Sequence, residues 1–264
     1  MRQLSVSVCV FLGVSVGLLA APSRAFAQAD EIQVYDASLA SKGVFNLTWH
    51  NNFTPNGIKT PAFPGGITTD KSLNGVTEWA LGVSSWFEAG LYLPLYSYDK
   101  DLGFKIDGLK LRTLFASPNA NDRKLGYGVG MEFSYNAKHW DESRITSEIR
   151  PILAWHPNTK VDLIVNPILD TAYDGVGNMV FAPSARLAYN RSDAWAVALE
   201  SYADFGQLKG FAAVADQSHQ LFAVIDHTTK SGYELEFGAG VGLTNASDKF
   251  VLKLLVAKDL GKLK

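Results

Sequence analysis

Apolar and polar residues alternate along most of this chain. In residues 232–243, GYELEFGAGVGL, the side chains of Tyr233, Leu235 and Phe237 share one parity, whereas glutamates and glycines occupy the other. A period of two places successive side chains on opposite faces of a β-strand. The pattern therefore predicts a strand with one apolar face and one polar face.

Eleven further segments show the same alternation, and turn signals such as Pro157-Asn158 and Asp174-Gly175 separate them. The twelve predicted strands are 43–53, 76–84, 86–97, 105–116, 125–136, 143–155, 161–171, 179–189, 194–204, 218–227, 232–243 and 250–260. No shift in composition divides them, so we expect a single β domain. The longest connection, 54–75, is rich in Pro and Gly; it is either an exposed loop or a constriction folded into the lumen.

Either face of these strands could meet water. In a soluble lipocalin-like barrel or a periplasmic sandwich, the apolar residues point inward, whereas in a membrane barrel they point outward. The apolar parity includes Leu91, Leu93 and Leu95, and the polar parity combines charges with Gly and Ala, which suit a crowded interior. Aromatic residues such as Trp86 and Trp155 recur at strand ends, as in the interfacial girdles of outer-membrane barrels.

Strand length also favours the membrane, because segments of roughly 9–11 residues cross a bilayer at a tilt. Connections are mostly longer at one end of the predicted strands than at the other, which is typical of bacterial outer-membrane barrels. The sequence thus predicts an all-β fold, a transmembrane antiparallel up-and-down β-barrel of about 12 strands.

The N-terminus has the layout of a secretory signal peptide. Arg2 precedes an apolar run, and Ala25-Phe26-Ala27 and Ala27-Gln28-Ala29 offer small-x-small cleavage sites; a buried N-terminal helix is the alternative. We predict a signal peptide in 1–27, a periplasmic N-terminal segment in 28–42, which forms a brief strand or a plug, and an outer-membrane β-barrel in 43–264. Cys9, the only cysteine, falls in the signal peptide, which excludes disulfides and thiol-bound metal from the mature chain.

Charge limits the partners. Removing Arg2 and Arg24 leaves 22 of 24 basic residues against 26 acidic ones, so the mature net charge is −4. This balance does not indicate nucleic-acid binding.

No segment after the signal peptide reaches the roughly 18 apolar residues of a spanning helix, so only a closed barrel could cross a membrane. We expect the lipid bilayer and a small-molecule solute as partners, no cofactor and, because the histidines are scattered, no metal. No feature indicates an oligomeric state.

Charged residues of the polar parity would line the lumen of such a barrel. Turn positions predict a lumen charge cluster of Lys110, Arg112, Glu132, Glu148, Arg150, Asn166 and Arg186. Other predicted lumen acids are Glu78, Glu88, Asp170, Glu200, Glu234 and Glu236. These residues form either a salt-bridge network that satisfies buried charges or a selectivity constriction, and the two are compatible. Because acids outnumber bases, we expect a preference for cations or neutral solutes.

Three prolines interrupt the strand pattern. Pro151, Pro167 and Pro183 fall inside three successive predicted strands, where each removes a ladder donor. We expect bulges and a locally deformed wall there; a lateral opening is the alternative.

Several stretches resemble one family of uncharacterised bacterial outer-membrane barrels. They are EIQVYDA (31–37), GVFNLTWHNNFTPNG (43–57), NGVTEWALGVSSWFEAGLYLP (74–94), FSYNAKHWDESRITSEIRPILAW (133–155), VDLIVNPILDTAYDG (161–175) and WAVALESYADFG (195–206). The phrase GVSSWFEAGLYLP also resembles putative transporters of the meta-pathway of phenol degradation group. The resemblance implies the fold and carries no catalytic signature. Such barrels commonly end on an aromatic residue, whereas this chain ends DLGKLK.

Three functions are compatible with these features. The first is a narrow passive channel or transporter for small solutes, and the second is a non-conducting structural or interaction barrel. The third is a lipid hydrolase at the rim, for which Ser218-His219 and His139-Trp140-Asp141 are the nearest candidates. No catalytic motif surrounds either group, so we expect no enzyme.

The membrane assignment predicts heat-modifiable migration. Protein extracted from membranes with detergent should migrate differently in gel electrophoresis before and after boiling, because a closed barrel resists unfolding by the detergent. Recovery of the protein in the soluble periplasmic fraction would contradict the assignment.

Overall fold

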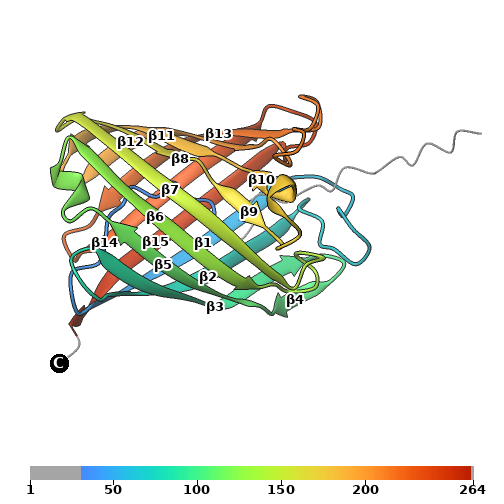
Figure 1. Ribbon diagram of the computed structural model, residues 1–264, viewed down its shortest axis with the longest axis horizontal. Coiled ribbons are helices and arrows are strands. Elements are labelled where there is room, and N and C mark those ends of the chain that lie inside the picture. Colours follow the sequence, from blue (N-terminus) through green and yellow to red (C-terminus); the bar gives the residue numbers. More distant parts are fainter. Residues whose placement is uncertain (1–30, 263–264) are drawn as a thin grey trace, which may run out of the picture.

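The computed structural model describes residues 31–262, which form a closed antiparallel β-barrel (Figure 1). Strand β1 (Val44–Asn56) pairs with both β2 (Ser72–Gly82) and the last strand, β15 (Phe250–Lys262), which closes the barrel. The remaining strands are β3 (Phe87–Asp99), β4 (Gly103–Ile106), β5 (Leu109–Ala116), β6 (Leu125–Tyr135), β7 (Ile145–Asn158), β8 (Val161–Asn166), β9 (Leu169–Thr171), β10 (Val180–Phe181), β11 (Ser184–Ser192), β12 (Trp195–Asp204), β13 (Ser218–Thr228) and β14 (Tyr233–Gly242).

The fifteen strand segments build twelve barrel strands. The pairs β4–β5, β8–β9 and β10–β11 each follow one path along the wall with a short interruption. Two 3₁₀ turns, η1 (Ala120–Asp122) and η2 (Val176–Asn178), lie in connections. No helix within residues 31–262 is long and apolar enough to span a membrane. The predicted up-and-down barrel of twelve strands is confirmed.

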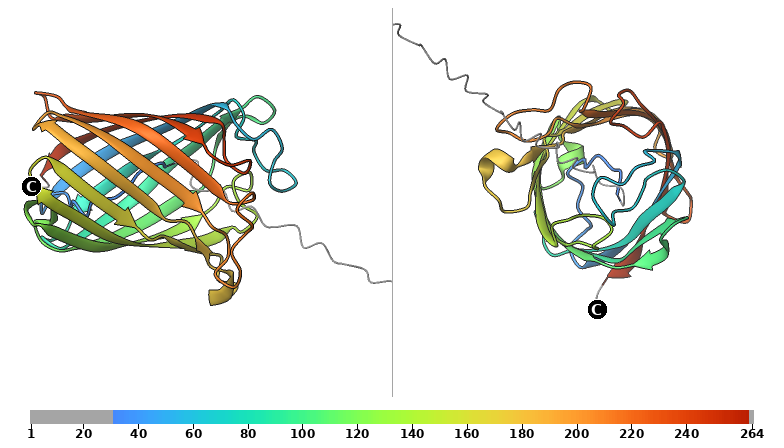
Figure 2. Two further views of the ribbon diagram at one scale, coloured as in Figure 1. Left: turned by 90° about the horizontal axis from the view of Figure 1, so that it is seen from above. Right: turned by 90° about the vertical axis from the view of Figure 1, so that its right-hand side faces the viewer.

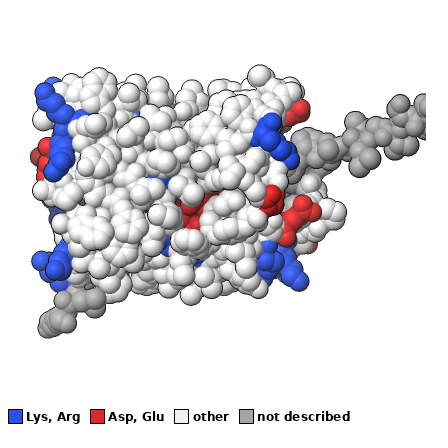
Figure 3. Space-filling model, in the orientation of Figure 1, with Lys and Arg blue, Asp and Glu red and all other residues white. Residues whose placement is uncertain are grey.

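The two strand faces meet different surroundings. Outward side chains such as Leu199 and Phe237 are 52% and 50% exposed, whereas Tyr92 and Phe222, which point inward, are fully buried. Figure 3 shows Lys and Arg at the two ends of one side of the barrel, with a broad band of mostly uncharged residues and one small acidic area between them. A surface of this kind suits the hydrocarbon core of a membrane.

Exposed aromatic side chains mark both ends of the wall. Trp155 and Trp195 lie at the end with the short turns, and Tyr98 and Tyr135 lie at the opposite end, which has the longer connections. Outer-membrane barrels place their longer loops outside the cell, so we call the long-loop end the outer end and the short-turn end the inner end.

The three interior prolines leave the strand register unchanged. Ile149 of β7 pairs with Leu169 of β9, and Leu153 of β7 pairs with Val165 of β8, which is one continuous register on both sides of Pro151. The predicted bulges at the prolines are therefore wrong. The ladder between β7 and β8–β9 has a gap here instead, because proline lacks the N–H donor; whether the gap opens laterally stays a prediction.

Carbonyls at or next to the prolines find donors on the next strand, on the side away from the gap. The Ala182 N–H donates to the Ile168 carbonyl at 3.1 Å, and the Ala203 N–H donates to the Pro183 carbonyl at 3.0 Å. These bonds join the proline-containing strands to their next neighbours, and the register of those neighbours is continuous, so the strands stay aligned.

A register shift occurs instead between β2 and β3. Glu78 pairs with Tyr92 and Val76 pairs with Leu95, so β3 holds one extra residue. Leu95, which the alternation placed outside, therefore lies inside and is 1% exposed. A bulge reverses the parity of every later side chain on its strand.

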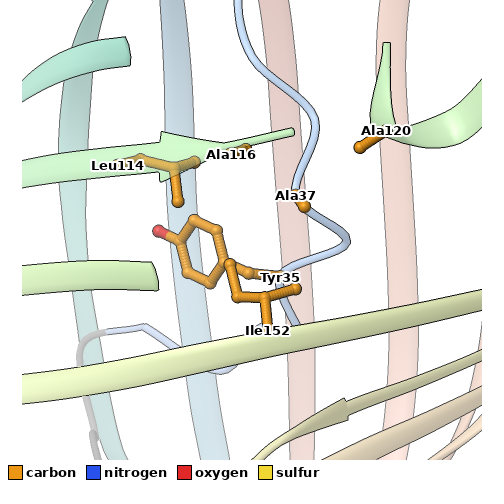
Figure 4. Packing of buried hydrophobic residues seen from close by; sticks show 6 residues of the cluster. All are labelled: Tyr35, Ala37, Leu114, Ala116, Ala120 and Ile152. Atoms are coloured by element: carbon orange, nitrogen blue, oxygen red, sulfur yellow. The ribbon is translucent and has the colours of Figure 1, made fainter. Parts of the chain in front are cut away.

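Residues 31–42 lie inside the barrel as extended chain without strand pairing (Figure 2). In Figure 4, Tyr35 and Ala37 of this segment point into a cluster of buried side chains from the wall and from η1. The wall and turn members of the cluster are Leu114, Ala116, Ala120 and Ile152. Residues 1–30, which include the predicted signal peptide, lie outside the described chain.

Two inward glycines offer a matched test of packing in the lumen. A Cβ atom at Gly240 would overlap the ring of Phe222, which is fully buried, whereas a Cβ atom at Gly130 would lie 3.7 Å from the Cβ of Arg150. We expect Gly240→Ala to lower the free energy of unfolding by about 1–3 kcal/mol and Gly130→Ala to leave it nearly unchanged. Denaturant titrations of the folded band measure both, and equal transitions would contradict the expected clash.

Candidate functional site in the barrel lumen

Ion pairs line the lumen in three groups. The first group joins β2, β3 and β5 around Arg112, whose guanidinium binds the carboxylates of Glu78 and, at 2.5 Å, Glu88. His50 of β1 lies 3.5 Å from the Glu78 carboxylate. The side chains of Arg112 and both glutamates are only 5–6% exposed. These charges stay buried because each has a partner of opposite sign.

The second group lies on β5, β6, β7 and β9 and is mainly acidic. Lys110 Nζ is 3.8 Å from the Glu132 carboxylate, and Arg150 makes two hydrogen bonds to Glu148, of 2.5 and 3.1 Å. Glu132 stands opposite Glu148 across β6 and β7, and Glu148 stands opposite Asp170 across β7 and β9. Three carboxylates in one row would repel each other if all were ionised.

The third group lies on the far wall. Arg186 of β11 binds Glu200, Asp226 and Glu236, and Lys253 of β15 binds Glu200 and, at 2.6 Å, Glu236. Arg186, predicted to lie in one cluster with Lys110 and Arg112, lies with Lys253 in a separate network. Alternation identified the inward face of each strand but did not fix which strands face each other across the lumen.

Tyr35 of the N-terminal segment lies between the first two groups. Its hydroxyl bonds the Glu31 carboxylate and the Tyr92 hydroxyl, each at 2.6 Å. The guanidinium carbons of Arg112 and Arg150 lie 5.2 and 4.5 Å from the centre of its ring. Two arginines against one aromatic ring stabilise its place in the lumen, because the negative face of the ring attracts cations.

Backbone groups of the same segment are bound as well. Asn166 accepts a hydrogen bond from the Tyr35 N–H at 2.8 Å and donates one to the Tyr35 carbonyl at 2.9 Å. Arg150 donates to the Gln33 carbonyl at 3.3 Å, and Lys253 donates to the Ile32 carbonyl at 3.2 Å. Closer to the inner end, the Ala40 N–H donates to Glu88 at 2.5 Å. All three ionic groups therefore bind this segment, which we call the plug (residues 31–42).

The predicted site residues have the inward parity of their strands, and one of them lies at the edge of the lumen. Glu234 lies at the inner end of β14 and is exposed, so it joins none of the ionic groups. Asn166 holds the plug backbone at Tyr35. Tyr35 and Tyr92 were not predicted as binding residues. Tyr92 shares the parity of Glu88, which could have identified it.

A cavity of about 320 Å³ remains below the plug at the inner end. Its lining combines plug residues with two inner turns and is rich in Ser and Asn: Ala37, Ser38, Leu39, Ala40, Ser41, Lys42, Ser84, Ser85, Ser117, Asn119, Ala120, Asn121 and Asp122.

The connection between β1 and β2 folds over the outer mouth. The Ile67 N–H donates to the His139 carbonyl at 2.8 Å, and the Thr68 hydroxyl donates to Asp99 at 2.7 Å. The side chain of Trp140 bonds the Ser97 hydroxyl beneath. Partial burial lowers the pKa of His139, a shift that Lys105 reinforces and Asp107 opposes. The neutral imidazole is thus favoured where the loop contacts residues 139–140.

Ser218 and His219 do not form a catalytic pair. The Ser218 hydroxyl is 3.3 Å from that of Ser247, while His219 Nε2 is 2.9 Å from the Gln217 amide oxygen. Adjacent strand residues point to opposite faces, so Ser218 and His219 diverge. Within residues 31–262, no three His, Cys, Asp or Glu side chains are placed to bind a metal ion.

Removal of Arg150 tests the second ionic group. Arg150→Ala leaves Glu148 without its bidentate partner and the plug without the contacts to Tyr35 and Gln33. We expect the free energy of unfolding to fall by about 3–5 kcal/mol, because the buried Glu148 carboxylate loses its bidentate cation. Arg123→Ala, at an exposed inner turn, is the matched control and should unfold as wild type does. A small and equal effect of both substitutions would show that water reaches the group.

Comparison with known proteins supports the fold class. No family model matches the chain, and no curated protein matches it in sequence. The structure is similar to the COG4313 outer membrane channel from Pseudomonas putida F1, with a TM-score of 0.58 and 13% identity, covering 87% of this chain and 100% of that one. The KdgM porin gives a TM-score of 0.55 at 5% identity and covers 82% and 99% of the two chains.

A KdgM porin in complex with disordered oligogalacturonate gives a TM-score of 0.53 at 5% identity, over 82% of this chain and 99% of that one. Identities this low concern the fold alone, so the resemblance to the phenol meta-pathway group stays a prediction. What the chains share is the β-barrel architecture of these outer-membrane proteins.

Proposed function

We propose that this protein is a narrow passive channel for small solutes, with a preference for cations or neutral molecules, and that the plug limits its conductance. The observation that carries the proposal is a lumen lined with charges in which acids exceed bases. The inward acids are Glu31, Glu78, Glu88, Glu132, Glu148, Asp170, Glu200, Asp204, Asp226 and Glu236, against the bases Lys110, Arg112, Arg150, Arg186 and Lys253. Such a lining favours cations electrostatically and opposes anions.

The way in which the plug is bound makes conduction compatible with a filled lumen. The plug has no strand pairing, and side chains of the wall hold it through hydrogen bonds and ring contacts. Chain bound in this way can exchange between bound and displaced states without any change in the barrel wall. The Ser- and Asn-rich cavity beneath it is large enough for small polar molecules.

The charge of the lumen also bears on the class of solute. The KdgM porin is known in complex with oligogalacturonate, an acid that carries one carboxylate per sugar unit. In this chain the carboxylate rows on β6, β7 and β9 would repel a polyanion. The proposed solutes are therefore uncharged or cationic.

A non-conducting structural barrel is the second candidate. The observation that favours it is that the lumen bases are bound by carboxylates and, through Arg150 and Lys253, by the plug. The two functions differ in what happens when the plug is removed.

Recordings in planar bilayers test the proposal. The mature chain should show small conductance steps, with a reversal potential in a KCl gradient that indicates cation preference. Deletion of residues 31–41 should enlarge the steps, because the lumen loses its filling. Lys230→Ala, at an exposed inner turn, should record as wild type does. A reversal potential that indicates chloride preference would contradict the proposed preference for cations. A folded deletion variant without conductance would favour the structural barrel.

A further inference from the structure

Two outer connections form one projecting unit. Residues 172–179 follow β9 and contain η2, and residues 205–217 follow β12. Figure 2 shows that the part around η2 hangs outside the cross-section of the barrel at its outer end. We call residues 172–179 and 205–217 the flap.

Hydrogen bonds join the two halves of the flap. The Leu208 N–H donates to the Met179 carbonyl and the Lys209 N–H to the Gly177 carbonyl, each at 2.8 Å. An isolated β-bridge links Val180 to Gln207. The flap is therefore one ordered body and not two independent loops.

The flap exposes apolar side chains to an unusual degree for a loop. Val176 is 75% exposed, Val214 74%, Tyr173 60%, Phe211 54% and Leu208 40%. Loops that stand in water rarely gather so many apolar groups, and an apolar patch of this kind marks a contact surface.

This patch is continuous with the lipid-facing wall. Phe211 lies 6.1 Å from Phe181 and 5.7 Å from Phe205, measured between ring centres, and these two residues lie where β10 and β12 end. On the other side, the Tyr173 hydroxyl bonds that of Ser147 on β7. The aromatic cluster thus extends the outer girdle of this part of the wall from the strands onto the flap.

We propose that the flap is an interfacial anchor that inserts its apolar side chains among the lipids of the outer leaflet. Burial of aromatic and aliphatic groups at the level of the headgroups is favourable in free energy, because the apolar groups leave water while the polar atoms of the same segment stay hydrated. Lys209, whose ammonium bonds the Asn178 amide oxygen at 2.5 Å, adds a cation suited to lipid phosphates.

A lipid surface suits the flap better than a second copy of the chain. A stable protein interface takes about 800 Å² from each partner, which the few exposed apolar side chains of the flap do not supply without the neighbouring wall. That wall already faces lipid, and the ring contacts of Phe211 with Phe181 and Phe205 join it to the flap.

Single-cysteine labelling tests this anchor. Cys9 is the only native cysteine and lies in the predicted signal peptide, so Val176→Cys and Val214→Cys give one site each in the mature protein. Leu199→Cys on the wall and Asn245→Cys at another outer turn are the matched controls. Each purified variant is labelled with an environment-sensitive dye and reconstituted into phosphatidylcholine vesicles that contain lipid with a doxyl quencher near the headgroup.

We expect dye at positions 176 and 214 to emit to the blue of dye at 245. It should also lose at least as much intensity to the headgroup quencher as dye at 199, which lies deeper in the bilayer. Emission and quenching equal to those at position 245 would overturn the proposal. Disulfide-linked dimers of Val176→Cys that form in vesicles, together with weak quenching, would overturn it in favour of contact between copies. Heat-modifiable migration of each variant confirms that the barrel is folded in every comparison.

Discussion

Hydrocarbon offers no hydrogen bonds, so each backbone N–H and C=O inside a membrane must find its partner within the protein. This constraint explains the closure of β1 onto β15, the continuous register past Pro151, and the use of neighbouring carbonyls around the missing proline donors. It also forces the polar parity of every strand inward. Because polar side chains find no partners in hydrocarbon, they point into the barrel, and the lumen is therefore crowded and charged.

Charges enclosed in this way need partners of their own. The wall supplies most of them, because Arg112, Arg186 and Lys253 each contact two or more carboxylates. The plug supplies the rest through Tyr35 and the backbone carbonyls of residues 32 and 33. The contacts of Tyr35 and of the carbonyls of residues 32 and 33 thus both hold the plug in the lumen and provide partners for the buried charges.

Much of this architecture follows from period-two alternation, because the pattern is local and repeats in all twelve strands. Alternation predicted the lumen charges, but it does not define which strands face each other across the barrel, so Arg186 was assigned to the wrong partners. Leu95 was misplaced because a bulge is a one-residue event with no pattern of its own. Tyr35 could not be placed, because its position depends on contacts with strands more than fifty residues away.

Lys253 lies on the last strand and contacts Glu200, Glu236 and the Ile32 carbonyl. The strand that seals the seam of the barrel therefore also retains the segment that enters just before the first strand. The Lys253 ammonium group thus links the closure of the barrel by β15 to the retention of the plug in the lumen. A chain without its final strand would lose both the closed wall and one contact that holds the plug. Truncation at the C-terminus would therefore also weaken the binding of the N-terminal segment.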